Sequence, residues 1–283
     1  MNAPSLTLHR SNRNDPTLRY DVHRPSGEIR GAVFLTHGYA EHSGRYGEVI
    51  DALNARGLIV ARWDLRGHGH SDGARGHVLS FDDYLRDADE LRVELAKDTT
   101  WRNAGPPVMI GHSLGGLITF HAAARDPGSV RGVILSSPFF GIKVAVPAVK
   151  RAAGKVMSKV FPGFGLPTGL KGTDVTRNTE LALNYDKDPL HFPNATARWF
   201  TEATRAHELA LDQARDFHLP ILIMAGGDDK IASLEATKKV FERIGSTNKE
   251  LRVLDSMYHE IFNEPERARW IADAADAATK FIG

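Results

Sequence analysis

Short apolar runs recur along the chain, and each is too short for a helix. The runs are nearly uninterrupted, which is typical of strands that are buried on both faces. They lie at residues 32–36, 58–61, 108–110, 133–135, 221–225 and 251–254. Two earlier segments, 5–9 and 18–22, alternate polar and apolar residues instead, with a turn-rich stretch between them. These two segments predict an antiparallel hairpin at one side of a sheet.

Helical spacing lies between the apolar runs. The clearest case starts at Phe81 and repeats an apolar residue every three or four positions as far as Leu95. It follows Ser80, and Asp83 stands three residues later, which is the arrangement of a capping box. A last helix is predicted over residues 266–281. Strands that alternate with helices predict an α/β fold, with a mostly parallel sheet and helices on both of its faces.

The alternation is interrupted once, between Pro138 and Leu219. The residues in this stretch show helix and loop patterns and no convincing strand. A structureless loop of that length is uncommon inside a compact domain. We therefore predict an inserted helical lid over residues 138–218, with the core formed by residues 1–137 and 219–283.

Composition narrows the class of protein. A chain of 283 residues fits one large domain with such an insertion. A net charge of +1 argues against a general nucleic-acid-binding surface, so we expect no nucleic-acid partner. The absence of cysteine excludes disulfides and a cysteine nucleophile, and it is compatible with a reducing cytoplasm. Residues 1–16 lack the apolar segment of a secretory signal, and no apolar run approaches the roughly 18 residues of a membrane span, so a cytoplasmic protein is expected.

A candidate nucleophile follows the apolar run at 108–110. Residues Gly111–Gly115 have the sequence GHSLG and precede a helix-forming stretch, so they match the G-x-S-x-G elbow between a strand and a helix. This tight turn brings the positions two before and two after the serine together, where a Cβ would collide with backbone. We therefore predict Ser113 as a nucleophile. The alternative is a glycine-rich turn whose serine caps the helix.

A serine nucleophile needs further residues. A histidine normally takes its proton, and a carboxylate fixes the histidine tautomer. In the α/β-hydrolase arrangement the chain order is serine, acid, histidine. After Ser113, one strand is followed by Asp228 and Asp229, and the next is followed by His259. Because open α/β sheets place active sites at the carboxyl ends of strands, we predict a triad of Ser113, Asp229 and His259.

The choice between the two aspartates rests on spacing. Both follow two glycines in a loop, so strand alternation does not separate them. The distance from Gly226, with the apolar Ile231 two positions after the second aspartate, favours Asp229. Asp228 is then a solvated neighbour.

Five motifs are spread over nearly the whole chain. They are HGYAEHSGRY at 37–46, DLRGHGHS at 64–71, GHSLGG at 111–116, DPL at 188–190 and YHE at 258–260. Together they resemble the monoacylglycerol lipase and lysophospholipase-like branch of the serine α/β-hydrolases, also called the serine aminopeptidase S33 family. The resemblance implies the α/β-hydrolase fold, a serine ester hydrolase without cofactor or metal, and a small-molecule substrate with a lipid-like acyl chain. It also implies an oxyanion hole formed by the backbone N–H groups of Tyr39 and Leu114.

The natural substrate stays open at this level. A monoacylglycerol is the leading candidate, while a lysophospholipid, a small ester or an N-terminal peptide bond are alternatives on the same fold. A binding protein without turnover is disfavoured by the intact set of triad residues. Epoxide hydrolases and dehalogenases of this fold carry an aspartate where Ser113 stands. The sequence makes no prediction about the oligomeric state.

Two further motifs favour a structural role. Residues 66–71 resemble a phosphate-binding loop but lack its lysine and the start of a helix, so a tight loop beneath the site is predicted. His68 and His70 have no further metal ligands near them at a usual spacing. We therefore expect no metal site.

The first half of the predicted lid is amphipathic. Pro147 can open a helix, with one face formed by Val149, Ala152, Ala153, Val156 and Val160 and the other by Lys150, Arg151, Lys155 and Lys159. The favoured interpretation is that the apolar face covers an acyl pocket. The alternative is a basic helix that makes transient contact with an anionic membrane surface, peripheral to the bilayer. Burial contributes roughly 0.8 kcal/mol per methylene, so either arrangement suits an acyl chain.

Overall fold

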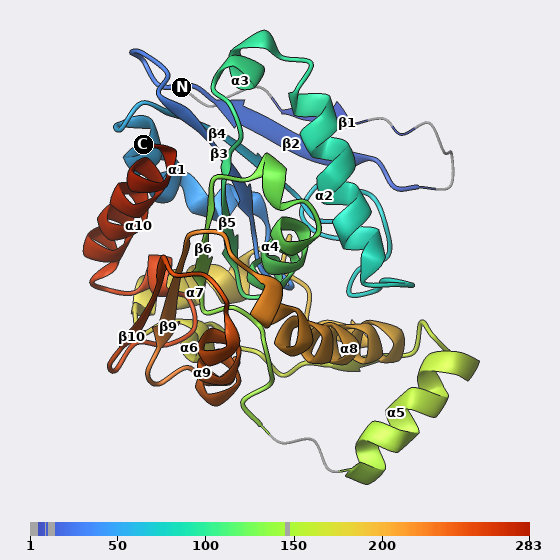
Figure 1. The fold of residues 1–283 in the computed structure, drawn as a ribbon. Helices are drawn as coiled ribbons and strands as arrows, with labels where there is room; N and C mark the ends of the chain where they lie inside the picture. Colours follow the sequence, from blue (N-terminus) through green and yellow to red (C-terminus); the bar gives the residue numbers. More distant parts are fainter. Residues whose placement is uncertain (1–4, 9, 11–14, 145–147) are drawn as a thin grey trace.

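The computed structural model describes residues 5–8, 10, 15–144 and 148–283. Its main sheet is formed by β1 (Leu6–Leu8), β2 (Leu18–His23), β3 (Gly31–Thr36), β4 (Leu58–Trp63), β5 (Val108–His112), β6 (Gly132–Ser136), β9 (Ile221–Gly226) and β10 (Lys249–Leu254). The strand order is β1-β2-β4-β3-β5-β6-β9-β10 (Figure 1). β2 runs antiparallel to β1 and to β4, and the remaining pairs are parallel. The mostly parallel sheet and the hairpin at its edge are confirmed.

Helices cover both faces of the sheet (Figure 1). They include α1 (Gly47–Asn54), α2 (Asp82–Leu95), α3 (Thr99–Asn103), α4 (Leu114–Arg125), α9 (Leu234–Arg243) and α10 (Arg267–Ile282). In β3, Phe34 packs in the core shared with α2 and α4, whereas Val33 and Leu35 pack in the core shared with α1 and α10. Successive side chains of a strand point to opposite faces, so burial on both sides requires an uninterrupted apolar run. The α/β fold class is confirmed.

The start of α2 follows the sequence pattern in part. The Asp83 carboxylate accepts the Ser80 N–H over 3.2 Å, as in a capping box. The Ser80 hydroxyl accepts the N–H of Asp82 at 3.3 Å, one residue short of the predicted partner.

The described residues between β6 and β9 form four α-helices and a short 3-10 helix, Ala214–Asp216. The α-helices are α5 (Ala148–Val160), α6 (Gly172–Val175), α7 (Thr179–Lys187) and α8 (Ala197–Gln213). It also holds two short antiparallel strands, β7 (Gly165–Pro167) and β8 (Asn194–Thr196). The prediction of no strand here was wrong, because three residues are too few to show a period of two. α8 returns the chain toward β9, which is the crossover that two parallel neighbours require.

α5 lies at the edge of the molecule, away from the main sheet (Figure 1). Val156 and Val160 are 61% and 60% exposed, so the prediction that the apolar face covers the pocket was wrong for these two residues, whereas Ala153 of the same face lines the cavity. Their neighbours Met157 and Ser158 turn inward instead. Sequence spacing states which residues share a face of a helix, and packing decides which face turns inward.

Part of the predicted lid helix lies outside the described residues. This applies to Pro147, and to the side chains of Val149, Lys150 and Arg151. Within the described ranges, no helix has both the length and the apolar character needed to cross a bilayer.

Candidate active site

Ser113 occupies a sharp turn between β5 and α4. Its backbone angles are φ 51° and ψ −117°, a strained conformation for a residue with a side chain. A Cβ at Gly111 would lie 2.4 Å from the carbonyl oxygen of Gly115, and a Cβ at Gly115 would lie 2.2 Å from that of His37. The elbow therefore requires both glycines, for the steric reason that the motif predicts.

The structure brings the three predicted triad residues together. The Nε2 atom of His259 lies 2.8 Å from Oγ of Ser113, and its Nδ1 atom lies 2.8 Å from Oδ2 of Asp229. All three residues are buried. If Nδ1 carries the proton and donates it to the carboxylate, Nε2 is free to accept the serine proton. This geometry suits a serine activated by a histidine base.

Electrostatics favour the charged form of the imidazole. Burial lowers the pKa of His259, but the carboxylates of Asp229, Glu260 and Glu41 outweigh burial and raise that pKa above its ordinary value. Burial raises the pKa of Asp229, yet His259 and two backbone N–H groups hold it below the usual range. The site can therefore stabilise the imidazolium that forms when the serine loses its proton.

The two aspartates after β9 have different surroundings. Oδ1 of Asp229 accepts the N–H groups of Ile231 at 2.8 Å and Ala232 at 2.9 Å, which leaves Oδ2 for His259. Asp228 is exposed. The geometry thus agrees with the choice of Asp229 from its spacing.

The turn after β3 lies against the nucleophile. A Cβ added to Gly38 would lie 3.1 Å from the Cβ of Ser113, so this position needs a small residue. The Gly38 N–H donates to Glu41 Oε1 over 2.5 Å. His37 lies 2.7 Å from the Gly38 carbonyl through Nδ1, and its Nε2 accepts the N–H of Leu65 at 3.0 Å. These bonds hold the turn to the end of β4.

The two predicted oxyanion donors flank this contact. Leu114 is the first residue of α4, where a helix leaves its N–H without an internal partner. Tyr39 follows Gly38 in the turn. Across the described ranges, neither backbone N–H donates to a protein acceptor. Their role toward an oxyanion stays a prediction.

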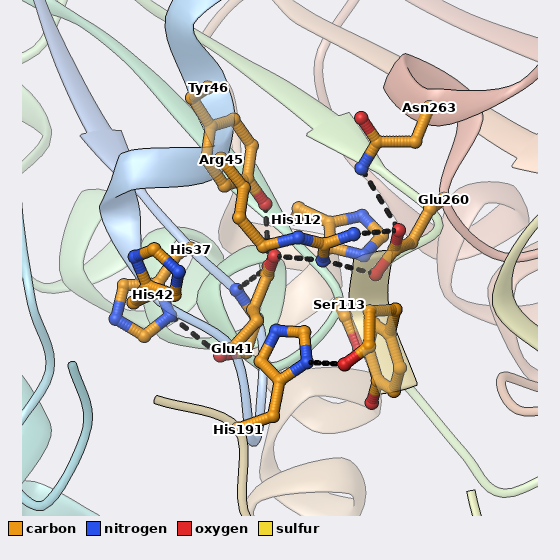
Figure 2. A network of polar contacts seen from close by, with 12 residues as sticks. His37, Glu41, His42, Arg45, Tyr46, His112, Ser113, His191, Glu260 and Asn263 are labelled. Atoms are coloured by element: carbon orange, nitrogen blue, oxygen red, sulfur yellow. Dashed lines mark hydrogen bonds and ion pairs between the residues drawn. The ribbon is translucent and has the colours of Figure 1, made fainter. Parts of the chain in front are cut away.

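A buried polar network adjoins the triad, and the sequence analysis gave it no role (Figure 2). Arg45 donates to Oε2 of Glu41 at 2.7 Å and to both carboxylate oxygens of Glu260 at 2.5 and 2.6 Å. The Tyr46 hydroxyl donates to Glu41 at 2.7 Å, and the Asn263 amide donates to Glu260 at 2.9 Å. The available sequence signal was the place of Glu41 and Arg45 in the motif at 37–46 and of Glu260 in the motif at 258–260.

Ser113 and His259 line a cavity of about 680 Å³. Much of its wall is apolar and comes from Phe139, Ile142, Met157, Phe164, Leu166 and Trp199. Near the triad the wall becomes polar, with Glu41, His112, Tyr185 and Glu260. The arrangement offers an apolar space for a chain and a polar space beside the nucleophile.

One cluster in the described part of the chain combines metal-binding side chains. His42, Asp188 and His191 place one ligand atom each within 4.8 Å of one another. His42 already uses both ring nitrogens, with Nδ1 accepting the N–H of Gly44 and Nε2 lying 2.9 Å from Asp188. Nδ1 of His191 lies 2.6 Å from the carbonyl of Tyr185. These contacts join the turn after β3 to the segment after α7, and the expectation of no metal stays a prediction.

The loop at residues 64–71 is held by its own hydrogen bonds. The Asp64 carboxylate accepts the His70 N–H at 2.8 Å, and the Asp64 carbonyl accepts the Ser71 hydroxyl at 2.6 Å. Arg66 pairs with Asp87 of α2 at 2.5 Å. This agrees with the structural role predicted for the loop.

Comparison with known proteins gives a consistent result. The sequence profile described as serine aminopeptidase, S33, matches residues 27–266. The monoacylglycerol lipase of Mycolicibacterium smegmatis is 34% identical over 249 residues, which cover 88% of each chain. Phospholipase YtpA of Bacillus subtilis is 34% identical over 238 residues, covering 83% of this chain and 90% of its own. The crystal structure of Paleococcus ferrophilus monoacylglycerol lipase superposes with a TM-score of 0.84 at 30% identity, covering 93% of this chain and 99% of that one.

Proposed function

The chain belongs to the serine aminopeptidase S33 family, and from this premise we propose that it hydrolyses monoacylglycerols, with Ser113, His259 and Asp229 as its catalytic triad. The protein is an enzyme that cleaves carboxylic esters with lipid-like acyl chains. The observation that carries the proposal is the buried Ser113–His259–Asp229 relay at the junction of an apolar and a polar space.

The reaction would proceed in two halves. Oγ of Ser113 attacks the ester carbonyl carbon while Nε2 of His259 takes the hydroxyl proton. The negative charge on the carbonyl oxygen is stabilised by the N–H groups of Tyr39 and Leu114. The tetrahedral intermediate then collapses, the glycerol oxygen leaves with the proton from His259, and the acyl group remains on Ser113.

Water completes the cycle. His259 removes a proton from a water molecule, which attacks the acyl carbon of the Ser113 ester. Collapse of the second intermediate returns the proton to the serine oxygen and releases the fatty acid. Asp229 stabilises the imidazolium in both halves and stays ionised.

The cavity supports a monoacylglycerol as substrate. Its apolar wall suits an acyl chain, with roughly 0.8 kcal/mol available for each buried methylene. Its polar end suits the free hydroxyls of glycerol. The charged side chains that line the cavity are Glu41 and Glu260, which are paired with Arg45, and Lys230. A lysophospholipid headgroup would meet charges of both signs there, and the substrate panel separates the two lipids.

We further propose that residues 138–218 act as a lid that contacts lipid surfaces. The large apolar side chains on and around α5 that are 48–69% exposed form the α5 patch: Val144, Val156, Val160, Phe161, Phe164 and Leu166. Three of them, Val144, Phe164 and Leu166, also line the cavity. The exposed Lys155 and Lys159 flank the patch. An apolar surface with basic neighbours suits transient contact with an anionic bilayer, from which a monoacylglycerol could enter directly.

A substrate panel tests the proposed activity. Monoacylglycerols of graded acyl length, lysophosphatidylcholine, p-nitrophenyl butyrate and an aminoacyl p-nitroanilide would be compared by kcat/KM. We expect the highest value on a monoacylglycerol and no turnover by Ser113→Ala. A preference for the aminoacyl substrate would contradict the substrate assignment, and ester hydrolysis by Ser113→Ala would contradict the nucleophile.

A further inference from the structure

We propose that Arg45 is a positioning residue. Its guanidinium bridges Glu41 and Glu260 and so holds the turn after β3, which lies against Ser113, in register with the loop that carries His259. The inference rests on the proposed function, because that function gives both segments their roles. Arg45 itself faces neither the reacting hydroxyl nor the imidazole in any hydrogen bond of the described structure.

One end of the Arg45 bridge reaches the turn after β3, which carries the predicted oxyanion donor Tyr39. Glu41 accepts from Arg45 through Oε2, while its Oε1 accepts the Gly38 N–H at 2.5 Å and the Tyr46 hydroxyl at 2.7 Å. The carboxylate therefore holds the His37–Gly38 peptide, one peptide before the N–H of Tyr39, a predicted oxyanion donor. Burial opposes ionisation of Glu41, but Arg45, His112, His37 and the Tyr46 hydroxyl together outweigh burial and hold the pKa of this carboxyl well below its usual range.

The other end reaches the histidine loop. Glu260 directly follows His259, and two parallel N–H···O bonds join its carboxylate to Arg45. The Glu260 N–H donates to the Val175 carbonyl of α6 at 2.8 Å. The backbone on the carboxyl side of His259 is thus held both by the guanidinium and by the segment between β6 and β9.

Arginine suits this position for a geometric reason. Its planar fork presents several N–H donors in fixed directions, so one side chain can serve two carboxylates. The Arg45 side chain is 12% exposed, and its partners Glu41 and Glu260 are 3% and 5% exposed. Its Cζ lies 5.2 Å from the centre of the Tyr185 ring, which closes the opposite side. A lysine has one compact ammonium and cannot reproduce the two-sided contact.

The bridge also has an electrostatic signature. In the described structure the charged and titratable groups that act on His259 include Asp229, Glu260, Glu41 and His112, and Arg45 is paired with the two glutamates. Removing the guanidinium leaves two carboxylates less compensated beside the imidazole, which favours its charged form. Removing the Glu260 charge has the opposite effect. A charged side chain that stabilised the fold far from the imidazole would shift neither.

The test compares four variants with the wild type. Arg45→Gln removes the bridge, Arg45→Lys keeps the charge without the fork, and Glu260→Gln releases one end. Arg66→Gln is the matched control, because Arg66 also contacts two carboxylates, Asp83 and Asp87, and its side chain is 11% exposed. Each variant would be measured for kcat and KM on p-nitrophenyl butyrate, for the rate of fluorophosphonate labelling, and for the pH dependence of kcat/KM.

We expect Arg45→Gln to lower kcat and the labelling rate about 30-fold with KM changed less than threefold, since small misplacements of reacting groups can cost about 100-fold. Arg45→Lys should recover only part of the loss. The acid limb of kcat/KM should move to higher pH in Arg45→Gln and to lower pH in Glu260→Gln, whereas Arg66→Gln should leave the rates of folded protein unchanged.

Several outcomes would overturn the bridge. They are a kcat of Arg45→Gln within twofold of the wild type, or full recovery of kcat by Arg45→Lys. A third is that the acid limbs of kcat/KM in Arg45→Gln and Glu260→Gln do not move in opposite directions. If Arg45→Gln fails to fold, Arg45→Lys and Glu260→Gln decide, and wild-type rates in both refute the proposal. A wild type that does not react with fluorophosphonate refutes the proposed function instead, so the two failures are distinguishable.

Discussion

Asp229 holds His259 on the side opposite Ser113, with Oδ2 2.8 Å from Nδ1 of the ring. Its second oxygen is occupied by backbone N–H groups of the same loop, so the carboxylate has little freedom to rotate. Asp228, one residue earlier, is exposed to solvent. Two adjacent aspartates thus provide a matched pair for mutation.

Asp229→Asn should lower kcat by about 10⁴, because the amide no longer fixes the tautomer in which Nε2 accepts a proton. Asp228→Asn is the control and should stay within twofold of the wild type. Steady-state kinetics on p-nitrophenyl butyrate measure both. Equal losses in the two variants would contradict the assignment of Asp229.

The pH dependence of the reaction follows from His259. The imidazole must be neutral to take the serine proton, so kcat/KM should fall about tenfold per pH unit below its pKa. Nearby carboxylates raise this pKa, which places the acid limb above the ordinary histidine value of about 6.5. A pH profile of kcat/KM from pH 5 to 9 checks the sign, and a limb clearly below 6.5 would refute it.

The elbow should not tolerate a side chain at Gly115. In Gly115→Ala the new Cβ meets the backbone oxygens of Thr36 at 2.3 Å and His37 at 2.2 Å, and neither atom belongs to a flexible side chain. Overpacking of this kind lowers the free energy of unfolding by about 1–3 kcal/mol. It would also displace the turn after β3. Differential scanning fluorimetry should show a lower Tm, together with a loss of activity.

Gly128→Ala is the control for the elbow variant. A Cβ at Gly128 meets no atom within 4 Å, so its Tm should stay near the wild-type value. Equal effects at the two glycines would show that the contact with β3 and its turn is unimportant.

The α5 patch predicts a dependence on lipid surfaces. In the double variant Val156→Glu with Val160→Glu, co-sedimentation with anionic vesicles should fall at least fivefold, because carboxylates oppose both the apolar and the electrostatic contact. Hydrolysis of vesicle-bound monoacylglycerol should fall in parallel. Hydrolysis of dissolved p-nitrophenyl butyrate should remain within twofold of the wild type.

A matched control lies on α2. Val93 is 67% exposed on α2 and is not among the residues that line the cavity. Val93→Glu therefore adds a carboxylate on another surface. It should leave vesicle binding unchanged. Equal losses in both variants would point to a general effect of charge and contradict the assignment of the α5 patch.

Much of the core could be predicted from sequence because burial on both faces demands apolar runs, as at Val33, Phe34 and Leu35. The triad geometry followed from one elbow and from residues after two strand ends, since parallel strands bring their carboxyl ends to one edge. The ion pair between Arg45 and Glu260 did not follow, because a contact across 215 positions leaves no local periodicity. The exposure of Val156 and Val160 was not predicted, because the spacing of apolar residues does not show which neighbours a helix packs against.

The crossover from β6 to β9 through α8 bears on how enzymes of this fold diversify. Two parallel neighbours such as β6 and β9 need one crossing helix in any case, and α8 already provides it. The strands described between α5 and β8 lie outside the main sheet, so this stretch could change in length or sequence while every strand of the main sheet keeps its neighbours. New substrate specificities could arise by changes within one contiguous part of the gene, while the chemistry of the reaction stays the same.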